Sequence, residues 1–136
     1  MQDQLKVFKI IHLALVVGLI VAYFFLGNIS ALSQLKLPTL DNASMIYIIL
    51  PVAAFLISNL MFRLLVSKID NTLSLKEKIV PYQSASIVRY AIIEGTAFFI
   101  LIIKPDFIIF GILLIVYLAL LMPTEQRIKR DLKHLD

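Results

Sequence analysis

The sequence predicts an all-α membrane protein, a single domain of residues 1–136 in which four transmembrane helices form a bundle. Three observations support this. Of the 136 residues, 60% are hydrophobic and 16% charged, with a mean hydropathy of +0.93, whereas soluble domains are about half apolar and about a quarter charged. The apolar residues fall into four long runs, and most basic residues flank them, as in polytopic membrane proteins.

Composition also excludes several functions. The chain has no cysteine, which rules out disulfides, thiol catalysis and thiolate metal sites. Its two histidines, His12 and His134, lie far apart without zinc-binding spacing, so we expect neither a metal nor another cofactor. The net charge of +4 comes from residues beside the apolar runs. This distribution favours the lipid bilayer and anionic headgroups as partners over nucleic acid.

The first two spans are separated by a loop, 27–43, in which polar residues alternate with leucines suited to the headgroup boundary. Residues 9–26 form the first span, long enough to cross about 30 Å of hydrocarbon, and we interpret it as a retained helix and not a cleaved signal. Residues 44–66 form the second span, which contains Pro51 and is predicted to kink there. The basic connection that follows, 67–81, contains Ser74 and Glu77 at capping-box spacing, which predicts a short helix that Pro81 ends.

The last two spans form a hairpin. Residues 84–103 carry Arg89 and Glu94 inside an apolar run, where an uncompensated charge is costly. The next turn is so short that the fourth span, 107–122, must return antiparallel to the third, with Asp106 as its N-cap.

The C-terminal segment, 123–136, has two interpretations. Ile128, Leu132 and Leu135 recur at helical spacing among basic residues, which favours a short amphipathic helix on the inner leaflet. The alternative is a solvated basic end that only fixes the topology.

The positive-inside rule predicts the orientation. Of the thirteen Lys and Arg residues, only Lys36 and Lys104 fall on one side of the predicted spans, so the other eleven mark the cytoplasmic side. Both termini are therefore predicted to lie on the cytoplasmic side of the cell (inner) membrane.

Polar residues of all four spans are predicted to share the cytoplasmic half of the bilayer. If they converge, they form a polar pocket open toward the cytoplasm, in which Glu94 meets His12, Arg63 or Tyr117. Arg89 is predicted to extend toward the interface or to pair with Asn59 or a lipid phosphate. The predicted buried cluster consists of Glu94, Arg89, Tyr90, His12, Asn59, Arg63 and Tyr117.

Small residues predict close packing between the first and third spans. Ala91 and Gly95 lie four apart on the third span, next to Glu94, and such small-xxx-small seams let helix backbones approach. The first span has a matching seam of Ala14, Gly18 and Ala22.

Three stretches, KIIHLALVVGLI, RYAIIEGTAFF and LMPTEQRIKRDL, resemble the signature of a family of small, uncharacterised four-helix bacterial membrane proteins. The resemblance covers nearly the whole chain. It implies a four-helix membrane fold and brings no established activity.

Three functions stay open. The leading hypothesis is a non-enzymatic accessory or scaffold subunit of a larger membrane assembly, because the segments outside the spans are too small for a catalytic domain. The second is a small oligomeric transporter or channel in which Glu94 couples a proton or substrate. The third is an anionic-lipid-binding protein in which Arg63, Arg89 and the basic tail hold headgroups.

Overall fold

The computed structural model describes residues 2–27, 41–103 and 105–132. Within these ranges the chain forms helices joined by turns and short irregular segments, without strands. The helices are α1 (Gln2–Leu26), α2 (Met45–Ser67), α3 (Leu75–Ile103), a 3-10 turn η2 (Pro105–Phe107), α4 (Ile108–Leu120) and α5 (Glu125–Leu132). The loop between the first two spans, the basic residues Lys36 and Lys104, and the end of the tail with His134 and Leu135 lie largely or wholly outside the described residues.

Three of the described helices, α1, α2 and α3, are long and apolar enough to cross a membrane. The fourth apolar run differs from the prediction, because α4 has 13 residues, about 20 Å of helix. It reaches the length of a candidate span only when the segment Pro105–Leu120 is joined to α5, and the two are bent by 91°.

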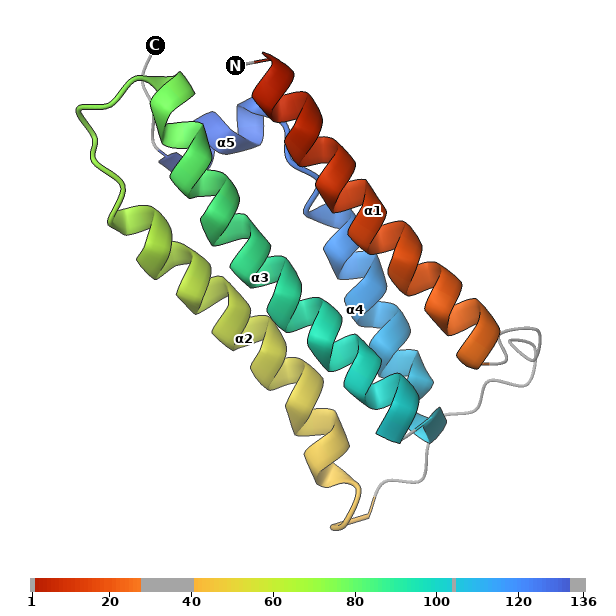
Figure 1. Ribbon diagram of the computed structural model, residues 1–136. Coiled ribbons are helices and arrows are strands. Elements are labelled where there is room, and N and C mark those ends of the chain that lie inside the picture. Colours follow the sequence, from red (N-terminus) through yellow and green to blue (C-terminus); the bar gives the residue numbers. More distant parts are fainter. Residues whose placement is uncertain (1, 28–40, 104, 133–136) are drawn as a thin grey trace.

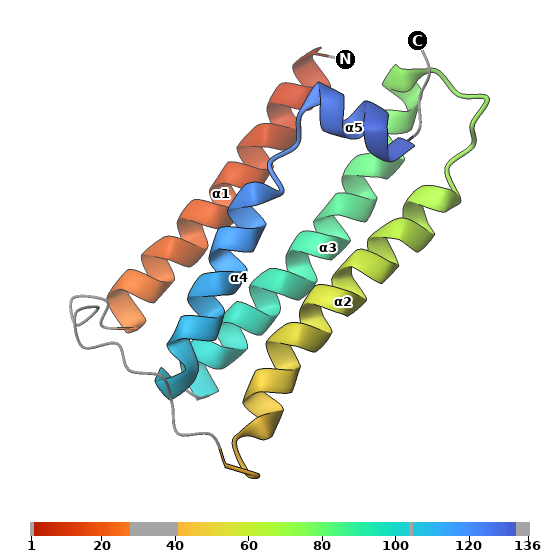
Figure 2. The ribbon, with the colours of Figure 1, turned by 180° about the vertical axis from the view of Figure 1, so that it is seen from behind.

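Helix α3 lies at the centre of the bundle and contacts α1, α2, α4 and α5 (Figures 1 and 2). Helices α3 and α4 run antiparallel, as the short turn between them predicted. The start of α1, the turn between α2 and α3, and α5 all lie at the same end of the bundle (Figure 1). This end carries most of the basic residues, and we call it the basic end.

The face that α1 turns toward the bundle is bulky. Its buried residues recur at intervals of three and four, the spacing of one helix face. At the end far from the termini, the Tyr23 hydroxyl donates a hydrogen bond to the Ala97 carbonyl of α3 at 2.5 Å. A Cβ atom placed on Gly111 of α4 would overlap the Tyr23 side chain. The buried residues of α1 are Leu5, Phe8, His12, Val16, Leu19 and Tyr23.

The predicted start of α3 is partly confirmed. The backbone N–H of Ser74 donates to Glu77 Oε2 at 2.9 Å, and the N–H of Glu77 donates to Ser74 Oγ at 3.3 Å. This is the predicted capping box. The helix that it starts does not end at Pro81, however, but continues to Ile103. Residue 81 would have donated to the carbonyl of Glu77, and because Glu77 is exposed, water can take that bond instead.

Two further predictions about helix ends are corrected. Asp106 lies inside the 3-10 turn η2, and Phe107 is the N-cap of α4, without a side-chain cap. The tail does form an amphipathic helix, but its apolar face packs on the bundle. Ile128 and Leu132 of α5 are 1% and 8% exposed, because α5 lies against α2 and α3.

Candidate functional site

A pocket of about 860 Å³ opens at the basic end of the bundle, where α2, α4 and α5 surround one side chain of α3. All four arginines of the sequence line this pocket, and no lysine is among the described residues that line it. We call it the arginine pocket. Its polar and charged lining residues are Asn59, Arg63, Ser67, Asn71, Arg89, Tyr117, Arg127, Arg130 and Asp131.

Arg89 is the most enclosed of the four arginines, with 5% of its surface exposed. Its guanidinium lies 3.7 Å from the ring centroid of Phe62, a cation–π contact that occupies one face of the planar group. The in-plane donors Nε and Nη2 are buried, and neither donates to an acceptor among the described residues. These two N–H groups point the same way and form the fork that binds a carboxylate or phosphate at two points.

Two of the other three arginines, Arg127 and Arg130, are engaged by described residues. Arg127 donates from Nη2 to the carbonyl of Leu120 at 3.0 Å, and Arg130 Nε lies 3.6 Å from Asp131 Oδ1. Asp131 also accepts a 2.7 Å hydrogen bond from the Tyr82 hydroxyl. Since Asp131 is the one acid among the described lining residues, the pocket has a net formal charge of +3.

Sequence reasoning placed only part of this pocket. It grouped Asn59, Arg63, Arg89 and Tyr117, and all four do line it. It treated Arg127 and Arg130 as basic tail residues outside the cluster. The signal that could have included them is the break after residue 122, where a proline and a capping threonine start a new helix that can fold back over the bundle.

Asn59 and Tyr117 join α2 to α4 at one end of the arginine pocket. The Tyr117 hydroxyl lies 2.7 Å from Nδ2 and 3.0 Å from Oδ1 of Asn59, and Nδ2 also donates to the Phe55 carbonyl at 2.8 Å. The Phe55 ring packs on Tyr117, with 4.8 Å between ring centroids. The predicted pairing of Asn59 with Arg89 is absent from the described contacts. Asn59 and Tyr117 therefore line the pocket without a hydrogen bond to the guanidinium.

His12 and Tyr90 form a different group, at the end of α4. His12 Nε2 donates to the Leu118 carbonyl at 2.7 Å and the Tyr90 hydroxyl to the Leu121 carbonyl at 3.0 Å, with the two rings 5.1 Å apart. The Leu118 carbonyl also accepts from the N–H of Leu121 at 3.1 Å. The last carbonyls of a helix, such as that of Leu121, have no partner within it, and in an apolar surrounding an unpaired one is costly. His12 and Tyr90 therefore stabilise the C-terminal end of α4. They do not line the arginine pocket.

Glu94 joins neither group. Its side chain is half-buried, and it makes no hydrogen bond or ion pair with the residues that the structure describes. The predicted meeting of Glu94 with His12, Arg63 or Tyr117 is therefore wrong for this structure. His12 is held by Leu118 and Tyr117 by Asn59, and Arg63 lies in the arginine pocket.

The two predicted packing seams do not face each other either. Ala14, Gly18, Ala91 and Gly95 are exposed, and only Ala22 is half-buried. A Cβ atom added to Gly18 or Gly95 would meet nothing within 4 Å. Helices α1 and α3 do pack together, but through the bulky face of α1 that carries His12 and Tyr23, where rings and hydrogen bonds fill the space that small residues would have closed.

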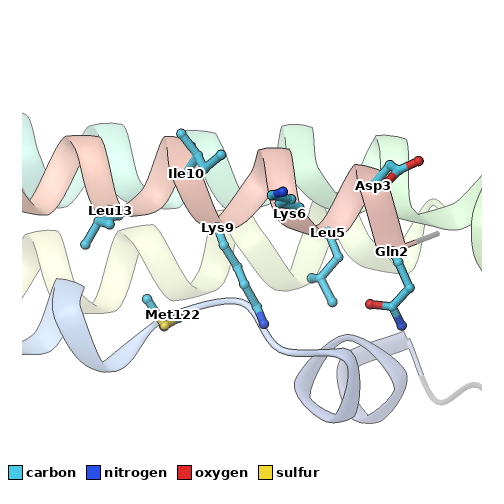
Figure 3. Close-up of a pocket in the computed structure, with 8 residues that line it drawn as sticks. All are labelled: Gln2, Asp3, Leu5, Lys6, Lys9, Ile10, Leu13 and Met122. Carbon is cyan, nitrogen blue, oxygen red and sulfur yellow. The ribbon is translucent and has the colours of Figure 1, made fainter.

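A second pocket, of about 440 Å³, lies between the start of α1 and the segment that follows α4. Figure 3 shows Lys9 extending from α1 toward that segment, beside Met122. Lys6 and Asp3 also line this pocket, and both are exposed. Unlike the arginine pocket, it contains no buried donor without an acceptor among its described side chains.

Comparison of the chain with protein-family models, curated proteins and solved structures gave no match. The resemblance to small four-helix bacterial membrane proteins therefore stays a prediction. Within the described residues, no group of three or more His, Asp or Glu side chains is arranged as metal ligands. The arginine pocket is the candidate site that this geometry supports best, and its chemistry is that of anion binding.

Proposed function

We propose that this chain is a four-span membrane protein, with both termini on the cytoplasmic side, that binds a phosphate-bearing anion in the arginine pocket. The proposal is for a binding protein and not an enzyme. It takes the third of the functions considered from sequence ahead of the other two, because the polar residues gather around arginines and not around Glu94.

One observation carries the proposal. Arg89 is 5% exposed, and its Nε and Nη2 have no acceptor among the residues that the structure describes. A buried charge left without a partner costs about 3–5 kcal/mol. The contact with Phe62 offsets about 2 kcal/mol of such a cost at most, and it leaves the N–H edge unsatisfied. A bound anion would supply the acceptors, since phosphate geometry matches the fork of a guanidinium.

The use of arginine supports the same conclusion. The chain has nine lysines and four arginines, and the lining of this pocket draws only on the arginines. A basic end that served topology alone would not need this separation, because lysine and arginine both act as positive-inside charges. Arginine is the better residue where a phosphate is held at two points.

The proposed topology is supported by the position of the chain segments. The start of α1, the α2–α3 turn and α5 lie at one end of the bundle, as four crossings require. Because the sequence has no cysteine, single cysteines report accessibility without background. In intact cells, Asn42→Cys should react with a membrane-impermeant maleimide, whereas Lys68→Cys should react only after lysis. The reverse labelling pattern would contradict the orientation.

Binding is tested by total phosphorus in the full-length protein, purified from membranes in a mild phosphate-free detergent. This readout does not depend on the source of the phosphate. We expect the wild type and the control Lys76→Gln, which removes an exposed charge outside the pocket, to retain more phosphorus per chain than Arg89→Gln. Equal phosphorus in all three proteins would overturn the proposal.

The accessory-subunit hypothesis stays a prediction beside this proposal. Binding of an anion does not exclude that the chain also belongs to a larger assembly. The same purification tests this, since stable co-purifying subunits would appear on a gel.

A further inference from the structure

We infer that the anion is the terminal phosphomonoester of a membrane phospholipid, which enters the arginine pocket sideways from the bilayer. This inference rests on the proposed function and specifies its ligand. It is carried by the charge in the pocket, the number of free donors and the shape of the opening.

The charge in the pocket exceeds what a phosphodiester supplies. Arg130 is already beside Asp131, with 3.6 Å between Nε and Oδ1. No carboxylate of the described residues pairs with Arg63, Arg89 or Arg127. A diester has one negative charge, whereas a terminal phosphate has a charge of about −1.5 to −2 at pH 7. The net charge of +3 in the pocket therefore favours the monoester.

The donors also match a terminal phosphate in number. Such a group presents three strong acceptor oxygens, whereas a diester has two unsubstituted oxygens. Three arginines of the pocket have no described carboxylate within ion-pair distance, and they come from three different helices, α2, α3 and α5. Arginines that approach from different sides can each take one oxygen, and Nε and Nη2 of Arg89 provide the one pair that is buried and unused.

The opening of the pocket favours a lipid over a soluble ester. The hydrogen-bonded Asn59 and Tyr117 line it from α2 and α4, and Arg130 and Asp131 line it from α5. Leu120, also a lining residue, is 67% exposed. An exposed apolar side chain beside a cationic interior suits a molecule that has acyl chains on one side of its phosphate. In the proposed topology, Leu120 lies at the depth of the inner leaflet.

The test is native mass spectrometry of the full-length protein in neutral detergent, with four probes added in separate arms. They are dioleoyl phosphatidic acid, dioleoyl phosphatidylglycerol, dioleoyl phosphatidylcholine and soluble glycerol 3-phosphate. We expect phosphatidic acid to bind about tenfold more tightly than phosphatidylglycerol, and the neutral-headed lipid and the soluble ester to bind more weakly still.

The arms separate the failure of this inference from the failure of the proposed function. Equal binding of the two anionic lipids would overturn the monoester assignment, and equal binding of glycerol 3-phosphate would overturn the lipid source. In both cases Arg89-dependent binding would still support the proposed function. If no probe bound in a way that depends on Arg89, both would be overturned.

Two substitutions guard against a folding artefact. Arg89→Gln removes the charge, and its lipid binding is compared with that of the wild type only at temperatures where its own unfolding curve shows it to be folded. Arg89→Lys keeps the charge and loses the fork, so we expect it to fold and to lose the preference for phosphatidic acid over phosphatidylglycerol. Lys76→Gln should keep the full preference. A preference that survives in Arg89→Lys would overturn the role given to the fork.

Discussion

Within its apolar run, helix α3 carries two charged side chains five residues apart, Arg89 and Glu94, whose surroundings in the bundle differ. Arg89 is enclosed by α2, α4 and α5, rests on Phe62 and shares a pocket with three further arginines. Glu94 is half-buried and makes no described polar contact, beside the exposed Ala91 and Gly95. In the sequence the two look alike, as charges within one apolar run. A charge in a membrane helix becomes a site only where other elements bring groups to it.

The largest expected effect is the loss of stability in Gly111→Ala, which tests whether the packing of the bundle depends on this glycine. Gly111→Ala must displace the Tyr23 side chain and its hydrogen bond to Ala97. Overpacking costs about 1–3 kcal/mol, and loss of a buried hydrogen bond a further 1–3 kcal/mol or so. We expect thermal unfolding in detergent to show a marked fall in midpoint for this variant.

Gly95→Ala is the matched control on the Glu94 side. Because its added methyl group meets nothing, we expect an unchanged midpoint. A loss of stability here would mean that the Glu94 face packs against another molecule, and the contrast drawn between the two regions would then fail.

A smaller effect is expected where polar residues hold the end of α4. His12→Ala removes one of two donors to the Leu118 carbonyl, the other being the N–H of Leu121. It also leaves a cavity, so we expect the protein to lose about 1–3 kcal/mol of stability. Retained phosphorus, measured on the folded fraction, should stay at the wild-type level. If phosphorus fell while the fold held, His12 would belong to the binding site after all.

A smaller effect again is expected at Phe62, whose ring packs against the guanidinium of Arg89. Phe62→Leu removes the cation–π contact, worth about 0.5–2 kcal/mol, and leaves the aliphatic packing largely in place. We expect binding of phosphatidic acid to weaken a few-fold as the guanidinium loses its fixed orientation. Phe55→Leu, on the far side of the Asn59–Tyr117 pair, serves as the control. Equal weakening in both would show that general packing, and not the stacked ring, governs binding.

The smallest expected effect is at Glu94. Glu94→Gln removes a charge that no described residue engages, and we expect phosphorus retention to match that of the wild type. Flux measurements in proteoliposomes complete the comparison. If the wild type showed flux and Glu94→Gln abolished it, the transporter hypothesis would be restored. The functional side chain would then be Glu94, outside the arginine pocket.

Much of the local structure could be predicted from the sequence. Three apolar helices, the Ser74–Glu77 capping box, the antiparallel hairpin and an amphipathic tail follow from hydrophobic runs and from residues close together in the chain. The predictions that failed at Pro81 and Asp106 also concerned local signals. At Pro81 the helix continues at little cost, because water can replace the lost backbone hydrogen bond at the exposed Glu77. At Asp106 the chain tightens into one 3-10 turn, η2, before α4 begins.

The site depended on contacts between distant parts of the chain. The sequence by itself determined that the chain is apolar, that it forms long helices and that its basic residues flank the apolar runs. These properties depend only on composition and on the order of residues along the chain. Only the tertiary structure decided that α5 folds back to bring Arg127 and Arg130 beside Arg63 and Arg89, that His12 serves the end of α4, and that Glu94 stays apart. Which side of a helix meets a partner depends on how rings and hydrogen bonds fill the interface, and small-residue spacing does not encode this.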